Sequence, residues 1–203
     1  MKCYNLGGNL IQIVQDNFKI IILSAPSGAG KTTVLQAVLK QIPELAFSIS
    51  ATTRPPRANE QHGTHYYFLA ITEFEQLKAQ GAFVEWEEVY PGRFYGTLYS
   101  EIERIQKEGK IPIFEVDVFG GISLKQKFGK QALSIFLNPP SLEALKERLI
   151  CRGTENAVDL EKRLQKAEIE LQQKSAFDII VENIFLEKAI EEVVFHIRKF
   201  IAA

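Results

Sequence analysis

The chain has 203 residues, with 24 Lys and Arg against 25 Asp and Glu and a formal net charge of −1. That length predicts one large domain, or a domain with small insertions, that can bury a core without disulfides or structural metal. The charge balance argues against broad nucleic-acid binding, which needs a basic face, and against a polybasic membrane anchor.

Residues 1–17 are expected to form a loosely attached N-terminal extension. Glycines and polar residues interrupt this segment, and the apolar run that follows, Ile20 to Leu23, is too short to span a bilayer. The two cysteines, Cys3 and Cys151, form no C-x-x-C pair, which fits a reducing compartment and excludes a cysteine-built zinc site. We therefore expect a cytoplasmic protein with no membrane partner and no nucleic-acid partner.

A glycine-rich loop separates a predicted strand from a predicted helix. Residues 19–24 form a β-branched run typical of a buried strand in a parallel sheet, and residues 31–41 carry apolar side chains at helical spacing. Between them lies Ala-Pro-Ser-Gly-Ala-Gly-Lys-Thr, residues 25–32, in the context that a phosphate-binding loop requires. Glycines let backbone N–H groups turn toward phosphate oxygens, and the helix N-terminus adds the positive end of its dipole.

Lys31 can reach the β- and γ-phosphates of a nucleotide, and the Thr32 hydroxyl can ligate Mg²⁺. The strict pattern asks for Gly where this chain has Ala25, but Gly28 and Gly30 are retained. The loop predicts binding of a nucleoside triphosphate and does not name the reaction. The residues expected around the triphosphate are Ala25, Pro26, Ser27, Gly28, Ala29, Gly30, Lys31, Thr32 and Thr33.

The segment 48–97 differs in character from the rest of the chain. It is rich in aromatic residues, and residues 66–69, 84–88 and 94–96 are expected to form short strands of a small sheet. Thr72-x-x-Glu75 is interpreted as a capping box that opens a helix ending near Gly81. The segment is expected to be an insertion at one edge of a larger sheet.

Helices and buried strands alternate along the remainder of the chain. We expect strands over 111–117, 132–137 and 178–181, and helices over 100–108, from a Ser141 cap to residue 150, over 159–174 and over 186–200. This alternation predicts a three-layer α/β fold with a parallel sheet.

Several spaced motifs resemble those of guanylate kinase. They are Ser48-Ile-Ser50-Ala-Thr-Thr-Arg54-Pro-Pro-Arg57, Gly63-Thr-His-Tyr66-Tyr-Phe68, Val84-Glu85-Trp86 and Tyr95-Gly96-Thr97, and the likeness runs from about Lys19 to the C-terminus. The resemblance implies transfer of the γ-phosphoryl group of ATP to GMP, giving ADP and GDP. It also implies a P-loop fold with its domain over 18–203: a core over 18–47 and 98–203, a GMP-binding region over 48–97 and a helical lid at about 148–165.

The resemblance assigns two sets of residues to GMP. Arg54 and Arg57 would clamp its phosphate, for which the planar fork of Arg is well suited, and Tyr66 and Tyr95 would donate hydroxyl bonds to it. The residues that would surround the guanine are Ser50, Glu85, Thr97 and Asp117. Guanine presents two donors along one edge, and the Glu85 carboxylate can accept both, whereas adenine would leave that carboxylate unpaired.

A second arginine cluster resembles the guanylate kinase lid. Arg148 and Arg152 share a helix face if the helix continues past residue 150, and Arg163 follows a short turn. Lid arginines would neutralise charge on the transferring phosphoryl group and exclude water. The alternative is that they pair with nearby carboxylates on a solvated helix. The residues expected to act in catalysis are Lys31, Arg54, Arg148, Arg152 and Arg163, and Arg152 and Asn183 are further expected at the adenine.

The cofactor implied is Mg²⁺, bound by Thr32 with Glu115 acting through water. Glu115 stands where the family usually has Asp, and Ile184 and Phe185 replace usual acidic residues near the last strand. The expected small-molecule partners are ATP and GMP, with dGMP as a further substrate, and the oligomeric state stays open, a homo-oligomer included.

Two alternatives remain beside this enzyme. One is a related kinase for another nucleotide or a sugar phosphate, and the other is a non-catalytic guanylate-kinase-like module that binds phosphorylated proteins. The intact Lys31–Thr32 pair and the placement of arginine favour the enzyme. The chain has eight Arg against sixteen Lys, and five of the eight fall in the two short stretches 54–57 and 148–163.

Overall fold

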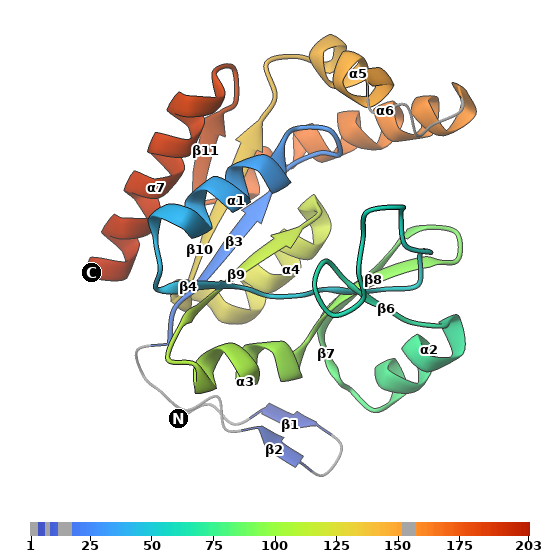
Figure 1. Cartoon of the computed structure of the whole chain (residues 1–203), viewed down its shortest axis with the longest axis vertical. Helices are drawn as coiled ribbons and strands as arrows, with labels where there is room; N and C mark the ends of the chain where they lie inside the picture. Colours follow the sequence, from blue (N-terminus) through green and yellow to red (C-terminus); the bar gives the residue numbers. More distant parts are fainter. Residues whose placement is uncertain (1–3, 7–8, 12–17, 152–156) are drawn as a thin grey trace.

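The computed structural model describes the backbone of residues 4–6, 9–11, 18–151 and 157–203, and the side chains of 18–151 and 160–203. Its central sheet contains β3 (Ile20–Ser24), β4 (Leu45–Phe47), β9 (Ile111–Val116), β10 (Ala132–Asn138) and β11 (Ile179–Glu182). The strands are all parallel in the order β11-β10-β3-β9-β4 (Figure 1). The expected parallel α/β sheet is confirmed, with β3 at its centre and the phosphate loop at the carboxyl end of that strand.

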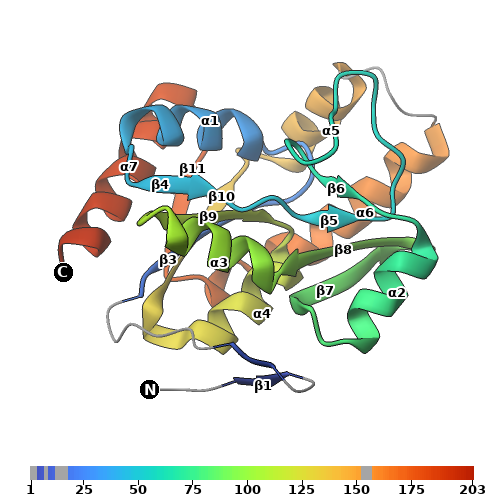
Figure 2. The same ribbon diagram turned by 60° about the horizontal axis from the view of Figure 1, so that its bottom comes forward.

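Helices cover both faces of this sheet because side chains alternate along each strand. From β3, Ile21 and Leu23 pack in one core with residues of α1 (Lys31–Gln41) and α7 (Leu186–Ala202). Ile20 and Ile22 point to the opposite core, which contains residues of α3 (Tyr99–Lys107) and α4 (Val118–Phe128). Figure 2 shows the two helical layers with the sheet between them. These are the three layers expected.

A smaller mixed sheet stands beside the main one. It contains β5 (Ala51–Thr52), β6 (Tyr67–Phe68), β7 (Phe83–Tyr90) and β8 (Arg93–Leu98) in the order β6-β5-β8-β7, with α2 (Ile71–Ala79) packed against it. Phe74 of α2 stacks on Phe83 and Phe94, with ring centroids 4.4 and 5.5 Å apart. The small sheet was expected, and the β7–β8 hairpin is longer than the sequence indicated.

Several local elements differ from expectation. The capping box at Thr72 is wrong, because the helix begins one residue earlier with Ala70 as its N-cap and no side-chain cap bond. The sequence analysis did not identify β4, β5 or α4, or the antiparallel hairpin of β1 (Tyr4–Leu6) and β2 (Asn9–Ile11) within the extension. These strands are only two or three residues long, and α4 contains two glycines that lower its helix propensity.

The helices α5 (Leu142–Cys151) and α6 (Ala157–Gln172) lie together beyond the carboxyl ends of the strands (Figure 1). The Ser141 hydroxyl accepts the N–H of Ala144 at 3.1 Å, which confirms the expected N-cap of α5. Residues 152–156, including Arg152, lie outside the described residues. Short 3₁₀ segments follow α4 (Gly129–Gln131) and α6 (Lys174–Ala176). Within the described chain, no helix combines the length and apolarity needed to cross a membrane.

Candidate active site

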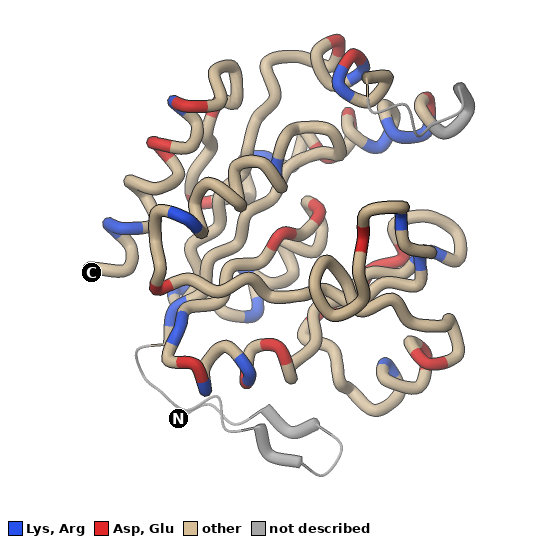
Figure 3. Tube along the Cα trace, viewed as in Figure 1, with Lys and Arg blue, Asp and Glu red and all other residues tan. Residues whose placement is uncertain are grey.

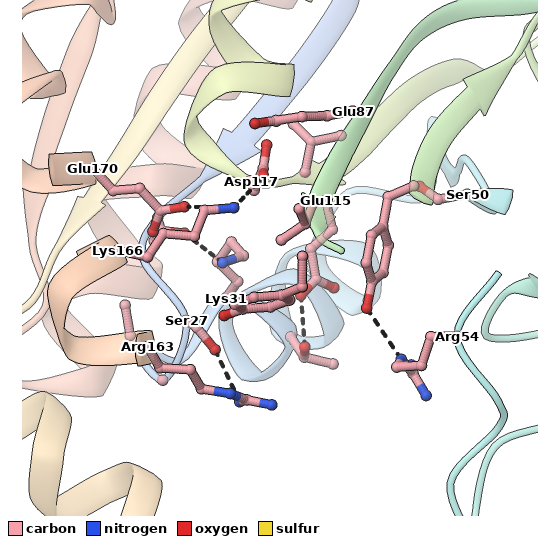
Figure 4. A pocket seen from close by; sticks show the side chains of 18 of the residues that line it. Ser27, Lys31, Ser50, Arg54, Glu87, Glu115, Asp117, Arg163, Lys166 and Glu170 are labelled. Carbon is pink, nitrogen blue, oxygen red and sulfur yellow. Dashed lines mark hydrogen bonds and ion pairs between the residues drawn. The ribbon is translucent and has the colours of Figure 1, made fainter. Parts of the chain in front are cut away.

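One cavity brings together residues from the phosphate loop, the small sheet and α6, as Figure 4 shows from close by. Its charged lining is supplied by Lys31, Arg54, Arg57, Glu85, Glu87, Glu115, Asp117, Arg163, Lys166 and Glu170. Figure 3 shows that these charges come from separate parts of the fold: the carboxyl end of β9, the loop before β6, and α6. A net charge of nearly zero is therefore compatible with a site that contains many cations and carboxylates side by side.

The phosphate loop is held in shape from behind. Gly28 and Gly30 have φ angles of 90° and 93°, a region that favours glycine. A Cβ on Gly28 would lie 3.1 Å from Leu149, so α5 packs closely on the loop. The Asn183 amide donates to the Ala29 carbonyl at 2.6 Å. The loop is therefore braced by α5 and by the end of β11 before any ligand binds.

Lys31 and Thr32 open α1 at the cavity. The Lys31 ammonium donates to the carbonyls of Ala25 and Pro26, which folds the side chain back over the loop. The Thr32 hydroxyl donates to the Glu115 carboxylate at 2.7 Å. The Thr32 hydroxyl and the Glu115 carboxylate are the hard oxygen ligands that Mg²⁺ prefers, so these two residues fit the expected metal site. Among the described residues, no cluster of three or more His, Cys, Asp or Glu could hold a metal ion.

Two of the arginines expected in a lid, Arg148 and Arg163, contact the phosphate loop. Arg148 of α5 donates to the carbonyls of Ala29 and Asn183, both at 3.4 Å. Arg163 of α6 donates to the Ser27 hydroxyl at 3.4 Å and lines the cavity. Pro26, Thr33, Arg148 and Asn183 do not line it. Arg148 and Arg163 therefore both contact the loop. The Asn183 amide also bonds to the loop, at the Ala29 carbonyl.

The two arginines expected at the GMP phosphate differ in their surroundings. Arg54 is nearly buried, and its guanidinium forms two bonds to Glu60, at 2.7 and 2.9 Å. It also donates to the Tyr95 hydroxyl at 3.2 Å and lies 5.2 Å from the centre of the Tyr66 ring. Burial opposes charge on Arg54, but the bonds to Glu60 and Tyr95 outweigh it and raise the arginine pKa. Arg57 is exposed at the mouth of the cavity.

Burial also raises the pKa of the Tyr66 phenol, which stays protonated and able to donate. The sequence analysis missed Glu60. A carboxylate a few residues after two arginines in a polar turn was the available signal.

The residues expected around guanine converge at one end of the cavity. The Thr97 hydroxyl donates to Glu85 at 2.6 Å, and Gly120 lies so close that a Cβ there would be 3.1 Å from the Glu85 carboxylate. Burial raises the pKa of Glu85 to about 7. Ser50 and Asp117 also line the cavity, while Thr97 is buried behind Glu85. All four expected guanine residues are thus brought together.

Three further charged residues line the cavity without having been singled out from the sequence. Glu87 is two residues after Glu85 on β7, so it faces the same way. Burial and the neighbouring Asp117 raise the pKa of Glu87 to about 8. The other two are Lys166 and Glu170, which follow Arg163 at helical spacing on α6. The strand and helix periods were signals that could have placed all three on the cavity side of β7 and α6, but not the groups that they contact.

Comparison with known proteins places this geometry in context. Residues 17–200 match the family model described as guanylate kinase. Curated guanylate kinases from Bacteroides fragilis and Bacteroides thetaiotaomicron are 49% and 43% identical. The first match covers 84% of each chain, and the second covers 99% of this chain and 98% of its relative. A crystal structure of guanylate kinase from Anaplasma phagocytophilum has a TM-score of 0.72 at 27% identity, covering 92% of this chain and 87% of that one.

Proposed function

The chain belongs to the guanylate kinase family, and we propose that the cavity described above is where it transfers a phosphoryl group between its two nucleotides. The enzyme phosphorylates GMP at the expense of ATP, giving GDP and ADP. The observation that supports the site assignment is the single cavity lined both by the phosphate loop and by Arg54, Arg57 and Glu85. A donor triphosphate and an acceptor monophosphate bound there would meet end to end.

The phosphate loop is proposed to bind the ATP triphosphate through residues 25–33, with Lys31 at the β- and γ-phosphates. Lys31 now bonds to loop carbonyls, and phosphate oxygens would take over those bonds. Phosphoryl transfer needs mainly alignment and neutralisation of spreading negative charge. Arg148 and Arg163, which already reach the loop, are proposed to supply part of that neutralisation, with Arg152 as a further lid cation.

At the acceptor end, the same proposal gives the phosphate to Arg54, Arg57, Tyr66 and Tyr95, and the guanine to Ser50, Glu85, Thr97 and Asp117. The clamp holds the attacking oxygen, while the bond from Thr97 fixes Glu85 for the two N–H donors of guanine. None of these contacts involves the ribose 2′-hydroxyl, so dGMP is proposed as a second substrate. The GMP-binding unit is proposed to be the region 48–97, and the lid the region of about 148–165.

Thr32 and Glu115 are proposed to hold Mg²⁺, directly and through water, because their oxygens lie 2.7 Å apart at the phosphate loop. When bound there, Mg²⁺ would neutralise charge on the triphosphate. The cytoplasmic location expected from the cysteine content stays a prediction.

ADP release with ATP and Mg²⁺ tests the proposal directly when GMP, dGMP, AMP, UMP and dTMP are compared. We expect fast release with GMP and dGMP and rates lower by 10³-fold or more with the others, as roughly expected when a buried carboxylate is left unpaired. Lys31→Ala should lower kcat by about 10²–10³-fold or more while the protein stays folded by circular dichroism. Equal rates with all acceptors, or an unchanged kcat in the variant, would contradict the site assignment.

A further inference from the structure

One face of α6 carries three charged residues that all reach the cavity. Arg163, Lys166 and Glu170 are spaced by three and four positions, so they form a stripe along one side of the helix. Figure 4 shows Glu170 and Lys166 on the side of Asp117, and Arg163 beside Ser27 of the phosphate loop. The stripe is therefore built from one rigid element and faces both nucleotide positions.

Arg163 and Lys166 contact different parts of the cavity. Arg163 donates to Ser27 of the phosphate loop at 3.4 Å. Lys166 donates to the Asp117 carboxylate at 3.0 Å and forms a longer ion pair, of 3.5 Å, with Glu170. The side chains of Lys166 and Asp117 are only 19% and 22% exposed, so water screens their attraction weakly. One helix thus contacts the ATP end through Arg163 and the guanine end through Lys166.

Lys166 also determines the electrostatic surroundings of Asp117. The other oxygen of Asp117 accepts the Gly120 N–H at 2.9 Å, so both oxygens of the carboxylate are held. Glu85 and Glu87 of β7 and Glu170 of α6 surround the same carboxylate, and Lys166 is the cation that bonds to it. The Lys166 ammonium lies 5.7 Å from the centre of the Tyr90 ring at the end of β7. Burial opposes ionisation of Asp117, but the attraction of Lys166 outweighs it and holds the pKa of that carboxyl below its usual value.

We propose that Lys166 is a positioning residue that holds Asp117 for guanine and, through α6, couples GMP occupancy to the binding of ATP. The proposal rests on the assigned GMP role of Asp117. Residues of one helix move together, so a shift of Arg163 toward ATP phosphates moves Lys166 relative to Asp117. Binding at either end therefore changes the affinity at the other, and the change must be reciprocal.

The test is equilibrium binding of GMP by calorimetry, with and without a saturating non-hydrolysable ATP analogue and Mg²⁺. For the unmodified enzyme we expect the analogue to tighten GMP binding about fivefold or more, within the usual range of coupling between sites. Lys166→Met should reduce that ratio below about twofold, and Lys166→Arg should retain most of it because the cation is kept. Lys162→Met is the matched control, since Lys162 is exposed on the same helix. Circular dichroism and thermal unfolding establish that each variant is folded.

The outcomes separate this inference from the proposed site. If Asp117→Asn leaves GMP binding unchanged, the assigned guanine role of Asp117 is wrong, and the inference falls with it. If Asp117→Asn weakens GMP binding but Lys166→Met keeps the coupling ratio of the unmodified enzyme, the site assignment stands and the inference is overturned. A ratio of one in the unmodified enzyme also overturns it. Loss of coupling in Lys166→Met but not in Lys166→Arg or Lys162→Met supports it.

Discussion

Arg54 and Glu60 form a two-pronged ion pair beside the cavity, with Nη1–Oε2 and Nη2–Oε1 distances of 2.7 and 2.9 Å. Arg54 also donates to the Pro55 carbonyl and the Tyr95 hydroxyl, so four of its five N–H groups are engaged. One N–H is left for a ligand. The Arg57 side chain makes no hydrogen bond or ion pair to any residue that the structure describes, although its backbone N–H bonds to Glu60. Arg57 is therefore the arginine able to offer a two-pronged contact to the GMP phosphate.

The first prediction is that Arg57→Lys raises KM for GMP about tenfold or more, with little change in KM for ATP. Lysine keeps the charge but cannot make two parallel bonds to one phosphate. Loss of one charge-assisted bond is worth roughly 1.5–3 kcal/mol. Steady-state kinetics with each substrate varied in turn provides the measurement. Arg93→Lys is the control, because Arg93 is exposed at the start of β8. An unchanged KM for GMP in Arg57→Lys would show that Arg54 carries the contact instead.

The second prediction concerns Glu60, which holds the turn that carries both arginines. Glu60→Gln should raise KM for GMP about tenfold and lower the free energy of unfolding by about 2 kcal/mol or more, because Arg54 would stay nearly buried without its counterion. Burial works against ionisation of Glu60, but the bonds from Arg54 and Arg57 outweigh it and lower the pKa of the carboxyl. The stabilisation is therefore present above the unfolded pKa and is lost as pH falls through the folded one.

Urea unfolding at pH 7 and at acid pH measures this loss, with Glu44→Gln as an exposed control. Full stability and an ordinary KM in Glu60→Gln would mean that the ion pair is dispensable.

Sites whose residues are adjacent in the sequence are the ones that the sequence predicts well. The phosphate loop is one continuous segment, so strand, glycines, Lys31 and Thr32 could be recognised together. The residues proposed at the guanine required motif spacing, because β7, β8 and the positions next to β5 and β9 supply them from distant parts of the chain. Glu60 and Lys166 could not be assigned from spacing alone, since the partners of each, Arg54 and Asp117, are decided by how loops and helices pack. The capping box expected at Thr72 is also absent, because α2 begins one residue earlier and its N-cap, Ala70, makes no side-chain bond.

The third prediction is that Glu85→Gln lowers kcat/KM for GMP by 10³-fold or more and reduces the preference for GMP over AMP. The amide can accept only one of the two guanine donors, and its own N–H₂ group would face a donor. Competition assays with GMP and AMP at several concentrations measure the change. Glu88→Gln is the control, because Glu88 lies on the opposite face of the same strand and is exposed. A preserved preference for GMP would remove Glu85 from the recognition of guanine.

The fourth prediction is a pH dependence of stability caused by Glu87. Burial and the nearby Asp117 raise its pKa to about 8, whereas Glu in an unfolded chain has a pKa of about 4.3. Between these values the folded protein holds a proton that the unfolded chain has released, so the free energy of unfolding falls as pH rises. Lys166, Glu170 and Glu85 face the same group and remain in every variant. The glutamine in Glu87→Gln cannot ionise, so this variant should lack the part of the fall in the free energy of unfolding that Glu87 causes.

The difference between Glu87→Gln and the unmodified protein should therefore grow between pH 5 and pH 8.5, to about 1–2 kcal/mol after allowance for solvent screening of a half-buried group. Urea unfolding across this range measures it, and the contribution of Glu85 cancels because both proteins contain it. Glu88→Gln, on the exposed face of the same strand, is the control for the substitution itself. If the free energy of unfolding of Glu87→Gln and of the unmodified protein changed in parallel with pH, the proton held by the folded protein would belong to another carboxyl group of the cavity.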